Sequence, residues 1–224
     1  MTLGRPRLHH RVLGSTNALA RELAAAGAPH GTLVTAAQQT AGRGRQGRSW
    51  VAPAGRALLA SVLLREPPEL LPLRAGLAAA DVCGPGAAVK WPNDVLLHER
   101  KVAGVLVEGR PQEGWAVLGI GINVAVRAAD LPQELRARAG GLSLEPADVE
   151  PVLERLLRAL GQRLDQDGGT VLAALRERDA LRGQLVEWGE GRGTATGIDD
   201  AGRLLVRAAG RTVVLTAGEV HLRG

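Results

Sequence analysis

Aromatic residues are scarce in this chain, which has no Tyr, no Phe and four Trp among its 224 residues. A hydrophobic core must therefore be built from Leu, Val and Ala, and the hydrophobic content of 45% is enough to build one. The length suits one sizeable domain, or one medium and one small domain. Each Trp is conspicuous in such a sequence, and Trp50 and Trp91 stand in polar, charged stretches where packing explains them less readily.

Other absences narrow the class of protein. The single cysteine, Cys83, excludes an intramolecular disulfide framework and fits a reducing compartment. No apolar run approaches the ~20 residues of a membrane helix, and the first residues lack the apolar stretch of a signal peptide. The five His residues have no metal-ligand spacing with Cys or acidic residues. We expect a cytoplasmic protein with no membrane span and no fixed metal site.

The charge balance is basic, with a net charge of +5 and a pI near 10.7. Such values are compatible with nucleic-acid binding, but the excess is small and rests on arginine in a chain rich in Arg and Ala. A basic RNA-binding protein is one hypothesis, with the segment GRGRQGR as its basic patch. The lack of Phe and Tyr, the usual stacking residues of such proteins, counts against it.

The segment GRGRQGRSW, residues 42–50, is the most unusual stretch of the chain and is called here the arginine loop. Its glycines leave the backbone N–H groups accessible and let the chain fold closely around a ligand. Its arginines offer planar, paired donors to carboxylates and phosphates. Trp50 adds a flat plate that can stack on a base. The segment therefore predicts a loop that wraps an anionic ligand with a planar end.

Hydrophobic periodicity indicates an α+β fold. It predicts helices over residues 18–26, 70–83, 151–164 and 170–181, and strands over residues 31–37, 57–64, 87–91, 95–97, 101–108 and 115–124. The strands after residue 87 follow one another without helices, which favours a mixed or antiparallel sheet over a doubly wound one. Short strands then recur over residues 185–188, 193–198, 204–207, 212–215 and 219–222, and predict a small β-barrel. We expect two domains, residues 1–181 and 182–224, packed together.

Several polar motifs contain more special residues than packing requires. Ser15, Thr16 and Asn17 precede the first helix, where one of them is enough for a cap, so the others are available to a ligand. The other motifs are Gln39 with the arginine loop, KWPND at residues 90–94, KVAGVLVE at residues 101–108 and GIGINV at residues 119–124. The GIG triplet is a weak dinucleotide signal, because no helix is expected after it.

Taken in order, STN, GRGRQGRSW, KWPNDV, KVAGVLVEG and GIGINV resemble the motifs of the biotin protein ligases, over residues 15–123. The resemblance implies a catalytic domain related to class II tRNA synthetases, with a mixed sheet and flanking helices, followed by an SH3-like barrel. It also implies a two-step reaction. Biotin attacks the α-phosphate of Mg-ATP to give biotinyl-5′-AMP and pyrophosphate, and a lysine of a biotin carboxyl carrier protein then takes the biotin and releases AMP.

The resemblance also implies roles for individual residues. Two anions must meet during adenylation, so positive charge is needed there, while the ureido ring of biotin needs both donors and acceptors. The implied catalytic residues are Lys101, Arg45 and Asp94. The implied biotin contacts are Ser15, Thr16, Asn17, Gln39, Gly42, Arg43, Gly44, Arg45, Lys101 and Gly104. The implied ATP or adenylate contacts are Arg45, Arg48, Trp50, Lys90, Asn93 and Asn123.

Some questions stay open at the level of sequence. Asp94 is either a ligand on the Mg or phosphate side or the group that orients or deprotonates the carrier lysine, and we favour the second role slightly. A lipoate ligase or octanoyl transferase of the same fold is the nearest enzymatic alternative, although KWPND together with GRGRxGRxW favours biotin. Fewer than twenty residues precede Ser15, so we expect no DNA-binding repressor domain. Homodimerisation by sheet-edge pairing is common in the family, but no interface stands out.

Overall fold

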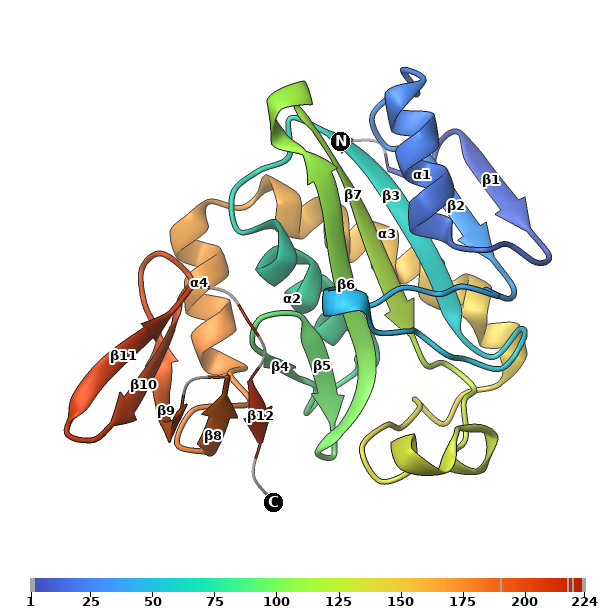
Figure 1. Cartoon of the computed structure of the whole chain (residues 1–224). Coiled ribbons are helices and arrows are strands. Elements are labelled where there is room, and N and C mark those ends of the chain that lie inside the picture. Colours follow the sequence, from blue (N-terminus) through green and yellow to red (C-terminus); the bar gives the residue numbers. More distant parts are fainter. Residues whose placement is uncertain (1–2, 190, 217, 219, 223–224) are drawn as a thin grey trace.

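A seven-stranded mixed sheet forms the centre of the computed structural model, which describes residues 3–189, 191–216, 218 and 220–222. The strand order is β1-β2-β3-β7-β6-β5-β4, with β1 parallel to β2 and every other neighbouring pair antiparallel (Figure 1). The strands are β1 (Arg7–His10), β2 (Leu33–Ala36), β3 (Leu58–Arg65), β4 (Ala88–Lys90), β5 (Asp94–Leu97), β6 (Arg100–Arg110) and β7 (Trp115–Ile122). The predicted α+β class and mixed sheet are confirmed.

Helices cover both faces of this sheet. The helices are α1 (Thr16–Ala25), α2 (Leu71–Cys83), α3 (Val149–Asp165) and α4 (Gly168–Glu177), and short 3₁₀ turns are η1 (Arg45–Gly47), η2 (Pro111–Glu113), η3 (Ala128–Asp130), η4 (Gln133–Leu135) and η5 (Pro146–Asp148). Successive side chains of a strand point to opposite faces. On β3, Val62 and Leu64 therefore belong to the core cluster of α2 and α3, whereas Leu63 packs with Ala20 and Ala24 of α1.

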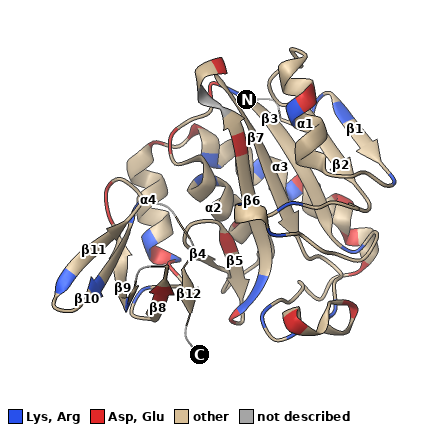
Figure 2. Cartoon of the chain, viewed as in Figure 1, with Lys and Arg blue, Asp and Glu red and all other residues tan. Residues whose placement is uncertain are grey.

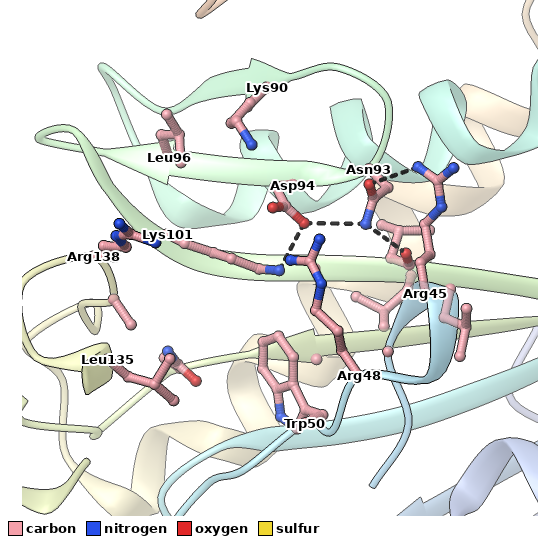
Figure 3. Close-up of a pocket in the computed structure, with 18 of the residues that line it drawn as sticks. Arg45, Arg48, Trp50, Lys90, Asn93, Asp94, Leu96, Lys101, Leu135 and Arg138 are labelled. Carbon is pink, nitrogen blue, oxygen red and sulfur yellow. Dashed lines mark hydrogen bonds and ion pairs between the residues drawn. The ribbon is translucent and has the colours of Figure 1, made fainter. Parts of the chain in front are cut away.

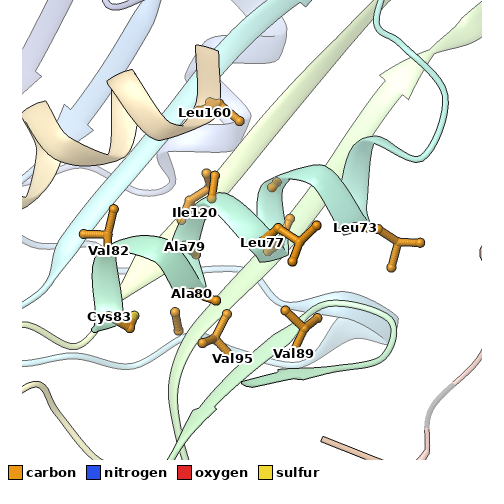
Figure 4. Close-up of a cluster of buried hydrophobic side chains, with 14 of the residues drawn as sticks. Leu73, Leu77, Ala79, Ala80, Val82, Cys83, Val89, Val95, Ile120 and Leu160 are labelled. Carbon is orange, nitrogen blue, oxygen red and sulfur yellow. The ribbon is translucent and has the colours of Figure 1, made fainter. Parts of the chain in front are cut away.

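The larger core is aliphatic, as the composition requires. Leu77 of α2, Leu160 of α3 and Ile120 of β7 are all at most 3% exposed and belong to one cluster (Figure 4). Trp91 is also only 3% exposed, and its indole N–H donates to the carbonyl of Gly202 at 3.0 Å. Trp91 therefore packs in the core and joins the first sheet to the C-terminal part of the chain.

The C-terminal part is a five-stranded antiparallel sheet in the order β11-β10-β9-β8-β12. Its strands are β8 (Leu185–Trp188), β9 (Gly191–Ile198), β10 (Leu204–Ala208), β11 (Arg211–Leu215) and β12 (His221–Leu222). The last strand was predicted over residues 219–222, and β12 covers its second half. Residue 219 lies outside the described residues. Figure 2 shows acidic and basic residues on both sheets.

One helix boundary differs from the prediction. The helix expected over residues 170–181 ends at Glu177. The following residues pair with β4 instead, because Val89 N donates to the carbonyl of Arg178 and Ala180 N donates to the carbonyl of Val89. Tertiary pairing therefore replaces the last helical turn. In the described part of the chain, no helix has both the length and the apolar character needed to cross a membrane.

Candidate active site

A cavity of about 1310 Å³ opens on the α1 face of the first sheet and extends to the C-terminal sheet. Residues of both sheets line it, including Gly104 and Gly121 of the first and Glu187 and His221 of the second. All predicted site residues line this cavity except Gly42. The structure therefore brings together motifs that are more than a hundred residues apart in the sequence.

Two glycines on neighbouring strands form part of the cavity floor. Leu59, Gly121 and Gly104 are neighbours across β3, β7 and β6, and the Trp50 indole lies on the two glycines. A Cβ at Gly121 would lie 2.6 Å from the indole, and one at Gly104 would lie 3.0 Å from it. The indole nitrogen Nε1 is buried and has no hydrogen-bond partner among the described residues. Trp50 thus occupies the surface above Gly104, one of the biotin contacts that the resemblance implies.

The next rung carries a network of neutral polar groups. Ser61, Gly119 and Leu106 are neighbours across the same three strands, and Asn17 lies over Gly119, where a Cβ would collide with the amide. Ser61 Oγ lies 2.6 Å from Asn17 Oδ1 and 2.8 Å from Thr16 Oγ1. This arrangement fixes the Asn17 amide through partners in the protein.

The N-terminus of α1 extends this network to the next loop. Thr16 donates from its backbone N–H and from Oγ1 to Gln39 Oε1, at 2.7 and 3.1 Å. Ser15 is the N-cap of α1 and accepts from Ala18 N. The predicted group of donors and acceptors around Ser15, Thr16 and Gln39 is therefore contiguous, and it lies beside the cavity.

Four residues from three segments form the polar centre of the site (Figure 3). Lys101 Nζ lies 2.7 Å from Asp94 Oδ1, and Asn93 Nδ2 donates to the same oxygen at 3.0 Å. Arg45 Nη1 donates to Asn93 Oδ1 at 3.0 Å, which ties the arginine loop to the turn between β4 and β5. Lys101 also lies over Trp50, 5.6 Å from the ring centre, a cation–π geometry.

Cations dominate the part of the cavity next to this centre. Burial lowers the pKa of Lys90. The positive charges of Lys101 and Arg48 lower this pKa further, whereas the negative charge of Asp94 raises it. Burial likewise lowers the pKa of Arg45. A cluster of partly buried cations is costly to hold together without a ligand and favours an anion. The cavity is therefore suited to a polyanion.

The sequence reasoning missed Arg138 and His221, two basic residues that also line the cavity. Arg138 comes from the loop after η4, and His221 comes from β12. Burial lowers the pKa of His221, and the neighbouring charges of Lys90, Arg48 and Arg138 contribute to the same effect. Neither residue belongs to a motif, so only tertiary structure reveals them.

Asn123 lies where β7 ends, and only the nitrogen of its side-chain amide has a hydrogen-bond partner among the described residues. Nδ2 donates to the carbonyl of Gly140 at 2.8 Å, while Oδ1 is buried and has no partner among the described residues. The free acceptor and the unpartnered indole N–H of Trp50 both lie in the cavity lining. Buried polar atoms without partners are rare and indicate where a ligand completes the structure.

The arginine loop is a tight hairpin. Trp50 N donates to the carbonyl of Gly42 at 3.0 Å, and Gly44 N donates to that of Arg48 at 2.6 Å. A side chain at Gly42 would collide with the carbonyl of Trp50, so the predicted glycine requirement here comes from the hairpin backbone. In the described chain, no group of three or more His, Cys, Asp or Glu residues is arranged to hold a metal ion.

The fold and the cavity define a class of protein in which a mixed sheet carries a cation-lined cavity beside a group of neutral polar side chains. Comparison with known proteins makes the assignment specific. The model of the biotin/lipoate A/B protein ligase family matches residues 10–124, and that of the biotin protein ligase C terminal domain matches residues 185–223. The chain belongs to the biotin protein ligase family.

Individual relatives agree with this assignment. The biotin–[acetyl-CoA-carboxylase] ligase of Mycobacterium tuberculosis is 40% identical, with 94% of this chain and 86% of that protein aligned. The enzyme of the same name from Paracoccus denitrificans is 35% identical over 94% of this chain and 98% of its own length. The biotin protein ligase of Aquifex aeolicus, solved in complex with biotin and ATP, superimposes with a TM-score of 0.84 at 29% identity, covering 98% and 99% of the two chains.

Proposed function

We propose that the chain activates biotin with ATP as biotinyl-5′-AMP and then transfers the biotin to a lysine of a biotin carboxyl carrier protein. The observation that carries the proposal is the continuity of one cavity, in which the polar network of Thr16 and Gln39 adjoins the cation cluster around Lys101. A ligand with a neutral hydrogen-bonding head and an anionic tail fits this order of groups.

The polar network suits the biotin head. A ureido group presents two N–H donors and one carbonyl acceptor, so it needs partners of both kinds. Ser15, Thr16 and Gln39 supply hydroxyl and amide groups at the N-terminus of α1. The full set of proposed biotin contacts remains the one predicted from sequence. Within it, protein partners orient the Asn17 amide beside the biotin head, and Gly42 contributes by allowing the shape of the arginine loop.

The cation cluster suits the first chemical step. A carboxylate oxygen of biotin attacks the α-phosphorus of ATP, the bond from that phosphorus to the bridging oxygen of pyrophosphate breaks, and pyrophosphate leaves with the electron pair. Negative charge accumulates on the α-phosphoryl oxygens, which Lys101 and Arg45 stabilise. Arg48 and Lys90 neutralise the departing phosphates. Trp50 and the free Asn123 oxygen receive the adenine.

In the second step, the amine of the carrier lysine attacks the carbonyl carbon of the mixed anhydride, and AMP leaves. The attacking nitrogen must lose a proton to form the amide. Asp94 lies beside Lys101 and is the carboxylate in the polar centre that can orient this amine or accept its proton. The Mg²⁺ of the reaction arrives with ATP in this proposal, with Asp94 as the nearest carboxylate.

The remaining parts of the proposal concern organisation. We propose a catalytic domain of residues 1–181, related to class II tRNA synthetases, and an SH3-like domain of residues 182–224, supported by the two separate sheets. ATP as a substrate and the lone cysteine support a cytoplasmic location. Homodimerisation stays a prediction.

Biotin-dependent exchange of pyrophosphate into ATP tests the proposal directly. With folded protein and Mg²⁺, biotin should support exchange, and lipoate or octanoate should support much less. Absence of exchange with biotin would refute the proposal. Exchange with lipoate in place of biotin would assign the chain to the lipoate branch, and a salt-sensitive affinity for RNA without exchange would favour the nucleic-acid alternative.

A further inference from the structure

The carboxylate of Glu108 lies where the arginine loop meets β6, outside every predicted role. We propose that Glu108 is a positioning residue that fixes both Arg43 of the arginine loop and the Asn17 amide beside the biotin head. One carboxylate then couples the closure of the loop to the shape of the biotin pocket. The inference rests on the proposed function and concerns how its site is held together.

The two oxygens of Glu108 serve different elements. Oε1 accepts from Arg21 of α1 at 3.2 Å and lies 3.3 Å from Arg43 Nη1 of the loop. Oε2 accepts from Asn17 Nδ2 at 2.9 Å. The Glu108 side chain is 18% exposed, so it is the most buried member of its ion pairs with Arg21 and Arg43, which are 40% and 48% exposed. Three donors therefore converge on one half-buried anion.

The inner contacts continue into the biotin pocket. Asn17 Nδ2 points to Glu108 and to the carbonyl of Leu106, which orients Oδ1 toward the Ser61 hydroxyl. Ser61 in turn lies 2.8 Å from Thr16, which donates to Gln39. An ionised carboxylate can only accept hydrogen bonds, so Glu108 requires the NH₂ group of the Asn17 amide, and not its oxygen, to face it. An amide at position 108 removes that constraint, because it can donate as well.

The outer contact restrains the arginine loop. Among the side-chain contacts that anchor the loop on the rest of the chain are Arg45 on Asn93 at one side of the cavity and Arg43 on Glu108 at the other. A second cavity of about 460 Å³ lies between residues 41–49 of the loop and Leu106 with Glu108. The underside of the loop is therefore open space, and a polar contact across it substitutes for close packing. Binding of a phosphate by Arg45 would leave the Arg43–Glu108 anchor in place.

Stability measurements alone cannot reveal this role, because partly exposed ion pairs contribute little to folding. The informative quantities are the rate at which biotinyl-5′-AMP is released and the KM for biotin. A loop that is less well anchored should release the adenylate faster, and a misdirected Asn17 amide should raise the KM for biotin. A purely structural effect would lower the amount of active protein and leave both quantities unchanged.

Glu108→Gln is the central variant, since it keeps the size of the side chain and removes its charge. We expect release of biotinyl-5′-AMP about tenfold faster and a KM for biotin raised by a similar factor, with kcat for adenylation changed less. Asp81→Asn is the matched control. Asp81 is 24% exposed and pairs with Arg163 and Arg178, outside the cavity lining.

A double variant decides whether Glu108 acts through the loop. If it does, Glu108→Gln/Arg43→Gln should release the adenylate about as fast as Arg43→Gln alone. Release within about twofold of the Asp81→Asn control, or multiplicative effects in the double variant, would overturn the inference. If Glu108→Gln does not fold, Glu108→Asp provides the same comparison, because its charge is kept and its reach is shortened. Failure of the unaltered protein to exchange pyrophosphate would instead refute the proposed function.

Discussion

Lys101 and Asp94 form an ion pair across the β5–β6 hairpin, with 2.7 Å between Nζ and Oδ1. A register shift between Val95 and Leu96 lets Asp94 and Lys101, which are not direct partners in the hairpin, lie on the same side. The same ammonium lies over the indole of Trp50. In the proposed reaction, an incoming phosphate would compete with Asp94 for the ammonium and free the carboxylate for a second role.

Replacement of Lys101 by Ala should suppress adenylation without unfolding the protein. The ammonium stabilises charge that develops on the α-phosphate, and loss of one such donor typically costs about 10²-fold in rate. The Lys101 side chain is 34% exposed, so the lost ion pair has a small effect on stability. Pyrophosphate exchange measures the rate, and the melting temperature checks the fold. Near-normal exchange would remove Lys101 from the catalytic residues.

Replacement of Arg45 by Ala should mainly weaken retention of the adenylate. The guanidinium joins the loop to Asn93 and faces the phosphate site, so its loss removes an anchor and a charge together. We expect release of biotinyl-5′-AMP about tenfold faster, measured in a single turnover without carrier protein. Arg203→Ala is the control, because Arg203 pairs with Asp199 in the C-terminal sheet. Equal release rates for the two variants would contradict the assignment.

A methyl group at Gly121 should displace Trp50. A Cβ there would lie 2.6 Å from the indole, which is too close for the ring to keep its place. Gly121→Ala should therefore raise the KM for ATP about tenfold and change that for biotin less, because the adenine platform moves. Tryptophan fluorescence would report the movement. A selective increase in the KM for biotin would instead indicate that Trp50 borders the biotin chain.

Much of the site was predictable because its residues stand in contiguous motifs. The arginine loop, KWPND and the glycines of β6 and β7 are conspicuous for their residue types alone. Gly119 and Gly121 of β7 also follow the two-residue period of strands, so they share a face. The same period places Glu108 on the face of Gly104, a signal that was present in the sequence and carried no assignment.

Other features depend on contacts that a linear pattern does not encode. Arg138 reaches the cavity from a loop whose backbone pairs with Lys101 of β6, because Lys101 N donates to the carbonyl of Arg138. His221 reaches it from the last described strand, which the packing of the C-terminal sheet brings close. The early end of α4 follows from pairing of residues 178–180 with β4. Trp91 stands among charged residues in the sequence but is buried against Gly202, because the partner that covers it lies 111 residues away.

Lys90 provides a prediction that depends on pH. Its pKa is lowered, first by burial, so the folded state disfavours the ammonium more than the unfolded state does. This cost is present in full below the folded-state pKa, where Lys90 is charged in both states. It disappears as the pH rises from that pKa to above the ordinary lysine value, where the side chain is neutral in both states.

Lys90→Met should therefore raise the melting temperature at pH 7, by about 2–4 °C if the relief is near 1 kcal/mol. The advantage should shrink as the pH approaches about 10, because the unaltered protein then loses its buried charge. Saturating ATP should reverse the order at pH 7, since the triphosphate stabilises the ammonium. Differential scanning fluorimetry with and without ATP measures all three effects. A Lys90→Met variant stabilised by ATP as much as the unaltered protein would exclude Lys90 from the phosphate site.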